Sequence, residues 1–115
     1  MDEFQALQQR LLDFAKVRDW EQFHSPKNLV MAMNGECGEL ISHFQWLTEA
    51  ESHDLSAEKL AEVRFEMADV QIYLMRMAEV LGVDLMAAAN EKTDINENRF
   101  PVDKVKGAQK RAKEY

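Results

Sequence analysis

The sequence of 115 residues contains little of what disulfides, tight turns or membrane spans require. It has one cysteine, two prolines and four glycines, and no apolar run approaches the roughly 18 residues of a membrane helix. Cys37 cannot form an internal disulfide, and the acidic, polar N-terminus lacks a signal-peptide pattern. We therefore expect a cytoplasmic protein with no membrane partner.

Positive charge is also scarce outside the C-terminus. Residues 1–100 contain 9 Lys and Arg against 19 Asp and Glu, whereas residues 101–115 contain 5 against 2. An acidic body has no counterion-release drive toward nucleic acid, so we expect no nucleic-acid partner. Contact between this body and a phosphate-rich small molecule would need a divalent ion. The basic tail, residues 102–115, is expected to be a solvated extension.

Strand-like alternation is nearly absent, and the apolar residues recur instead with the period of a helix. A first helix is predicted from about Asp2 to Val17. Ser25 followed by Pro26 is a strong helix start, because a side-chain cap precedes a residue with preset φ. We expect this second helix to reach Trp46 or Leu47.

The second half of the chain contains equally clear helix boundaries. The segment "LTEAESHDLS" is typical of a loop, and Ser56 can cap a third helix that ends at Gly82. Asp84 can cap a fourth helix to about Asn98, and Pro101 stops it. The sequence thus predicts an all-α four-helix bundle in a single domain, residues 1–101. A domain this small buries a modest core, so association with another copy is expected.

Two acidic pairs at one-turn spacing are the main chemical signal. "GECGEL" contains Glu36 and Glu39, and "EMADV" contains Glu66 and Asp69. On a helical wheel the second pair falls in a polar ribbon between two apolar strips. The members of this ribbon are Glu62, Glu66, Asp69, Tyr73 and Arg76. The opposite side of that helix, expected to face solvent, carries Leu60, Arg64, Gln71 and Ala78.

The acidic pairs are either ordinary surface carboxylates or a metal site. Like charges one turn apart repel by a few tenths of a kcal/mol. Gathering four under partial burial costs several kcal/mol unless a cation or a proton compensates. Oxygen ligands on facing helices suit hard divalent ions, and Mg²⁺ in particular binds together with substrate phosphates. The pattern therefore favours a metal site.

Other metal chemistries fit less well. A carboxylate-bridged di-iron centre uses Glu-x-x-His, but Ser42 follows Glu39 and Ile72 follows Asp69 at that spacing. Neither Cys37 nor the three histidines supply zinc-ligand spacing. A non-catalytic helical module, for oligomerisation or partner binding, remains the alternative to an enzyme and needs no divalent ion.

Three stretches of the sequence together resemble a known family. "GECGEL…FQW", "FEMADVQIYLMRMAEVLGVDL" and "KTDINENRFP" are similar to the MazG-like nucleoside triphosphate pyrophosphohydrolases, most of all to the dCTP pyrophosphatase branch. The similarity runs from about Asp19 to Pro101. It implies cleavage of (d)NTPs between the α- and β-phosphates, dependent on Mg²⁺ with Mn²⁺ as a substitute, and a homo-oligomer, either a dimer or a tetramer of dimers.

The resemblance also implies roles for individual residues. Glu36, Glu39, Glu66 and Asp69 would be the metal ligands, and Glu36 is our candidate to orient or deprotonate the attacking water. The implied substrate-binding residues are Trp20 and Trp46 around the base, His24 and Asn28 in the matching segment, Tyr73 against the sugar, and Lys92, Asn96 and Arg99 at the phosphates.

The phosphate contacts and the base contact each need comment. Lys92 and Arg99 would also be favourable near a helix C-terminus without any ligand. Eukaryotic members of the branch carry a base-contacting histidine on the first helix, and the matching position here is Leu11. Strict preference for cytosine therefore does not follow from the resemblance.

Overall fold

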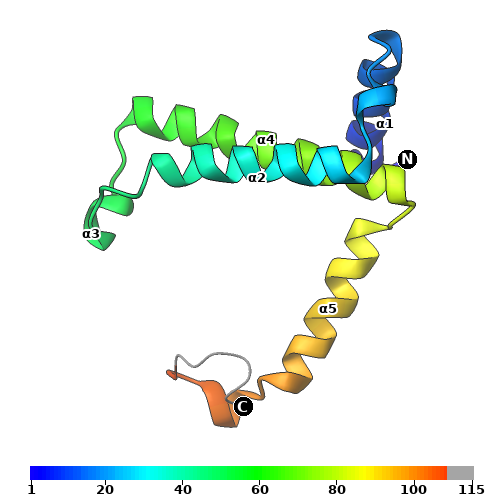
Figure 1. The fold of residues 1–115 in the computed structure, drawn as a ribbon. Coiled ribbons are helices and arrows are strands. Elements are labelled where there is room, and N and C mark those ends of the chain that lie inside the picture. Colours follow the sequence, from blue (N-terminus) through cyan, green and yellow to red (C-terminus); the bar gives the residue numbers. More distant parts are fainter. Residues whose placement is uncertain (109–115) are drawn as a thin grey trace. The chain divides into compact units, whose positions relative to one another are not determined.

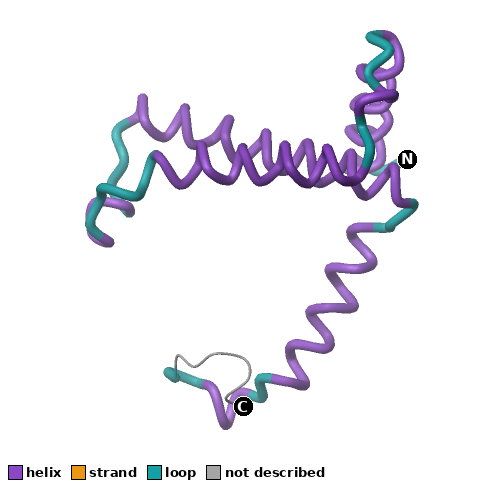
Figure 2. Tube along the Cα trace, viewed as in Figure 1, coloured by secondary structure: helices purple, strands orange, loops and turns teal. Residues whose placement is uncertain are grey.

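The computed structural model describes residues 1–108 of the chain, and within them every regular element is helical (Figures 1 and 2). This confirms the predicted all-α class. The elements are α1 (Glu3–Val17), the 3₁₀ turn η1 (Glu21–Phe23), α2 (Pro26–Ser42), α3 (Glu49–Ser52), α4 (Ala57–Leu81), α5 (Leu85–Arg99) and α6 (Val102–Val105). No helix among residues 1–108 is long and apolar enough to cross a membrane.

The helix starts are set by side-chain caps at the residues that the sequence indicated. Ser25 accepts a hydrogen bond from the backbone N–H of Asn28, and Ser56 accepts one from that of Lys59. Such caps satisfy backbone donors that have no partner within the helix. Gly82, with φ of 68°, ends α4 in the left-handed region, where a residue without a Cβ is favoured.

The segment between α2 and α4 differs from the prediction. Helix α2 ends at Ser42 rather than at Trp46 or Leu47, and residues 43–46 form successive turns. The Ser42 hydroxyl donates to the carbonyl oxygen of Glu39, a local bond that competes with helix continuation. The expected loop also contains the short helix α3, whose start is fixed by a capping box between Thr48 and Glu51.

Helices α2 and α4 run antiparallel side by side and form the principal helix pair of the first unit (Figure 1). Helix α1 packs against α4, where the Gln8 side chain donates to the carbonyl oxygen of Met75. The helical wheel predicted that Ala78 faces solvent, and this prediction was wrong. Ala78 is buried, because both α1 and α2 pack against α4. The buried apolar residues among those described are Ala15, Leu29, Val63, Met75 and Ala78.

The residue contacts divide the chain into two compact units, Met1–Gly82 and Val83–Tyr115. The first unit contains α1 to α4, and the second contains α5 and α6. The sequence placed residues 1–101 in one domain and 102–115 in a tail, and this assignment stays a prediction. Helix α6 lies within that tail, and residues 109–115 of the tail lie outside the described residues.

Leu29 provides a direct test of the α2–α4 core. Its side chain is 1% exposed, so Leu29→Ala should lower the free energy of unfolding by about 2–5 kcal/mol through lost burial and a residual cavity. Val17→Ala is the matched control, because Val17 is 79% exposed and should change stability by less than about 0.5 kcal/mol. Chemical denaturation followed by circular dichroism measures both. Equal effects of the two substitutions would contradict this core assignment.

Candidate metal centre

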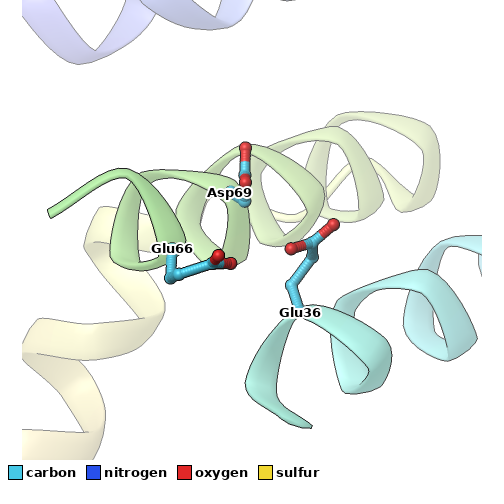
Figure 3. A group of neighbouring side chains, drawn as sticks. All are labelled: Glu36, Glu66 and Asp69. Carbon is cyan, nitrogen blue, oxygen red and sulfur yellow. The ribbon is translucent and has the colours of Figure 1, made fainter. Parts of the chain in front are cut away.

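The packing of α2 against α4 brings carboxylates from both predicted acidic pairs together. Glu36 projects from α2 toward α4, which presents Glu66 and Asp69 one turn apart (Figure 3). One carboxylate oxygen from each of these three residues lies within 4.8 Å of the others, and all three side chains are partly buried. Three of the four predicted metal ligands are therefore neighbours in space.

This spacing fits the donor set of a hard divalent cation. Oxygens that share one such ion at about 2.0–2.6 Å lie no more than about 4–5 Å apart, on opposite sides of the ion. Three carboxylates from two helices leave part of an octahedral shell for water or phosphate oxygens. The cluster is thus suited to a divalent metal that also contacts a substrate.

Glu36 shows the electrostatic consequence of this arrangement. Burial raises the pKa of the Glu36 carboxyl above its ordinary value, and the negative charges of Asp69 and Glu66 raise it further. The charge of Glu39 adds a smaller contribution in the same direction. Each effect disfavours the ionised form of Glu36 in the metal-free protein, so a bound cation would relieve the repulsion.

Glu39 has a different position from its predicted partners. It lies one turn after Glu36 on α2, its side chain is exposed, and it is not among the carboxylates that cluster within 4.8 Å. Its role as a metal ligand stays a prediction.

His43 is a further neighbour of the cluster. Its Nε2 atom lies 3.8 Å from Glu66 Oε1, and its Nδ1 atom lies 3.3 Å from the Lys59 ammonium nitrogen and 3.7 Å from Glu62 Oε2. The sequence contained one indication of this, since His43 follows Glu39 by one turn. The imidazole lies between the Glu66 carboxylate and the exposed Lys59–Glu62 pair.

A small pocket lies farther along the same helix. Its volume is about 120 Å³, and it includes three predicted substrate-binding residues: Trp20, His24 and Tyr73. Tyr73 follows Asp69 by one turn of α4, so the pocket adjoins the acidic cluster along the helix. The remaining lining residues are Leu11, Phe14, Ala15, Ile72 and Arg76.

The other predicted substrate residues lie elsewhere. Trp46, in the turns after α2, is 86% exposed and does not line this pocket. Asn28 donates from its side chain to the carbonyl oxygen of Phe23, which fixes the turn before α2. Lys92, Asn96 and Arg99 lie on α5 in the second unit, and their contact with phosphates stays a prediction.

The fold and the site together define a class of protein: all-helical, with a carboxylate cluster between two antiparallel helices. The chain belongs to the MazG-like family, whose model matches residues 31–115. It is similar to a pyrophosphatase of known crystal structure from Archaeoglobus fulgidus, with a TM-score of 0.83 and 31% identity. That match covers 88% of this chain and 94% of the other.

Curated relatives are closer in sequence. The chain is 46% identical over 91 residues to human dCTP pyrophosphatase 1, which covers 77% of this chain and 54% of the human protein. It is 43% identical over 98 residues to the rat protein of the same name, which covers 84% and 58%. The chain therefore spans a little over half the length of these relatives.

Metal binding should stabilise the chain if these carboxylates share an ion. With the divalent cation at 100 times its Kd, the folded state gains about 2.7 kcal/mol, so Tm should rise by several degrees. Asp69→Asn should abolish this rise. Glu36→Gln should abolish it as well, and should raise the Tm of the metal-free chain, because one repelled carboxylate is removed.

Glu58→Gln is the matched control for both substitutions. Glu58 is an exposed acid in the first turn of α4, remote from the cluster. Its removal should leave the metal-dependent rise in Tm intact. Differential scanning calorimetry with and without a chelator measures each variant. A rise that survives Asp69→Asn and Glu36→Gln would show that the ion binds elsewhere.

Proposed function

We propose that this chain is a divalent-metal-dependent nucleoside triphosphate pyrophosphohydrolase that acts on deoxynucleotides such as dCTP. The observation that carries the proposal is the cluster of Glu36, Glu66 and Asp69 between α2 and α4. The names and identities of the curated relatives support the choice of substrate class. The reaction adds water across the α–β phosphoanhydride and releases a nucleoside monophosphate and pyrophosphate.

The metal in this proposal is Mg²⁺, with Mn²⁺ able to replace it. Oxygen-only donors and room for water or phosphate oxygens are the features that Mg²⁺ sites share. When bound, such an ion neutralises phosphate charge and lowers the pKa of coordinated water. Glu66 and Asp69 would hold it from α4, Glu36 would hold it from α2, and Glu39 is the proposed fourth ligand.

Glu36 is the proposed general base. Glu36 projects from α2 toward the carboxylates of α4, so it would lie beside a water held at the metal centre, within reach of its proton. In the proposed step the water oxygen attacks the α-phosphorus as Glu36 accepts a water proton. The bond from the α-phosphorus to the bridging oxygen breaks, and pyrophosphate leaves. Because the nucleophile is water, no covalent enzyme intermediate forms.

The substrate would lie along α4. The phosphates would contact the metal centre, and Lys92, Asn96 and Arg99 on α5 are the proposed donors to their oxygens. The nucleoside would extend past Tyr73 into the pocket that Trp20 and His24 line. Asn28 would support this pocket through its bond to the η1 turn, and Trp46 would cover the base.

Pyrophosphate release tests this activity. The wild-type chain with Mg²⁺ should release pyrophosphate, and not orthophosphate, from dCTP. Asp69→Asn and Glu39→Gln should each lower kcat/KM by about 100-fold or more, which is roughly 2.7 kcal/mol of lost transition-state stabilisation. Helicity by circular dichroism, with Glu58→Gln as a fully active control, separates loss of chemistry from loss of fold. Near-normal turnover by both variants would remove these residues from the site.

We further propose that the chain functions as a homo-oligomer. A shallow groove of about 420 Å³ between α2 and α4 is lined almost entirely by apolar side chains, including Ile41, Phe44 and Met67. Several large apolar residues on these two helices are also exposed, as is Phe65 at 63%. Exposed apolar surface of this kind is typical of a protein interface, and a second copy of the chain is the proposed partner.

Sedimentation velocity tests the oligomer. Met67→Glu should shift the chain toward monomer, because a carboxylate would be buried without a partner in the contact. Val17→Glu, at an exposed position near the end of α1, should leave the sedimentation coefficient unchanged. A wild-type chain that sediments as a monomer at all concentrations would exclude this assembly.

A further inference from the structure

Arg76 is a buried cation that the proposed reaction does not use. It lies on α4 within the nucleoside pocket and is only 4% exposed. Burial of a guanidinium is costly unless charge partners and hydrogen bonds compensate. A surface position would avoid this cost, so the burial of Arg76 points to a function for its contacts.

Two groups satisfy part of the hydrogen-bonding capacity of the Arg76 guanidinium. Arg76 Nη1 donates to Glu79 Oε2 at 2.8 Å, and Nη2 lies 3.3 Å from His24 Nδ1. Within the described residues, the buried Nε atom of Arg76 has no hydrogen-bond partner. An unpartnered buried donor is unusual, because nearly all buried polar groups in proteins have a hydrogen-bond partner.

The contact with Arg76 fixes the chemical state of His24. A guanidinium has donors and no acceptor, so His24 Nδ1 must be unprotonated to accept from it. The neutral imidazole then carries its proton on Nε2, on the opposite edge of the ring. Burial and the charge of Arg76 both lower the pKa of His24, against a smaller opposing effect of Glu21, and so favour this neutral form.

The size of the pocket suits a single ring beside His24. Its volume of about 120 Å³ is close to the roughly 150 Å³ of a cavity that accepts benzene. Trp20 and Phe14 contribute aromatic walls. Arg76 follows Asp69 by seven residues, about 10 Å along α4, a span that one nucleoside bridges between its phosphates and its base.

We propose that Arg76 is a positioning residue for base recognition: it holds His24 as the Nε2–H tautomer, whose N–H donates to a carbonyl acceptor of a bound pyrimidine. This inference rests on the proposed function, because it assumes that the pocket receives the base of a triphosphate. It assigns Arg76 no contact with the reacting phosphates. Loss of Arg76 should therefore weaken base binding and leave the chemical step intact.

Kinetics on two probes separate base recognition from chemistry. Arg76→Met should raise KM for dCTP by about 3- to 10-fold, the value of one hydrogen bond, with kcat unchanged. For 2-deoxyribose 5-triphosphate, which has no base, neither constant should change. Arg76→Lys, which keeps a cationic donor for His24 Nδ1, should restore most of the affinity. Arg10→Met, at an exposed arginine of α1, is the control and should behave as wild type.

The tautomer of His24 provides a readout that does not depend on turnover. Long-range ¹H–¹⁵N correlation spectra of the full chain should show His24 protonated on Nε2, and Arg76→Met should add the Nδ1–H form. An unchanged tautomer or an unchanged KM for dCTP in Arg76→Met would overturn the inference and leave the proposed function standing. A wild-type chain that releases pyrophosphate from no triphosphate would instead overturn the proposed function, and the base-recognition role with it.

Discussion

Repulsion among the carboxylates that α2 and α4 bring together is the constraint on which the rest of the structure depends. Glu36, Glu66 and Asp69 present oxygens within 4.8 Å of one another, and burial together with their charges raises the pKa of Glu36. The helix pair nevertheless holds them there, because α2 packs along α4 and both helices contribute buried apolar residues, Leu29 and Val63, to the core. A bound cation would compensate this charge and so stabilise the arrangement.

Helix α4 connects this cluster to the pocket that Trp20 and His24 line. Asp69, Tyr73 and Arg76 follow one another at intervals of about one turn, so they occupy one side of the helix. Helix α1 and the η1 turn then cover the later part of this side with Phe14, Trp20 and His24 in the pocket wall. One helix therefore sets the distance between the carboxylate cluster and the pocket, and the neighbouring segments complete the pocket wall.

Much of this could be predicted from the sequence, because helix boundaries and acidic periodicity are local properties. Ser25, Ser56 and Gly82 determine their boundaries through contacts within a few residues. The early end of α2 could not be read in the same way, since the Ser42 hydroxyl bond competes with a periodic pattern that continues to Leu47. The burial of Arg76 was also beyond the sequence, because it arises from tertiary packing that brings in residues as distant as His24, 52 residues away.

The central claim is that the carboxylates and a divalent ion together form the binding site for a nucleoside triphosphate. Isothermal titration calorimetry with a non-hydrolysable α,β-imido analogue of dCTP tests it most directly. The account predicts binding in the presence of Mg²⁺, little binding in its absence, and no Mg²⁺-dependent binding by Asp69→Asn. Equal affinity of the wild-type chain with and without Mg²⁺, or no binding in either condition, would contradict it and favour a non-catalytic helical module.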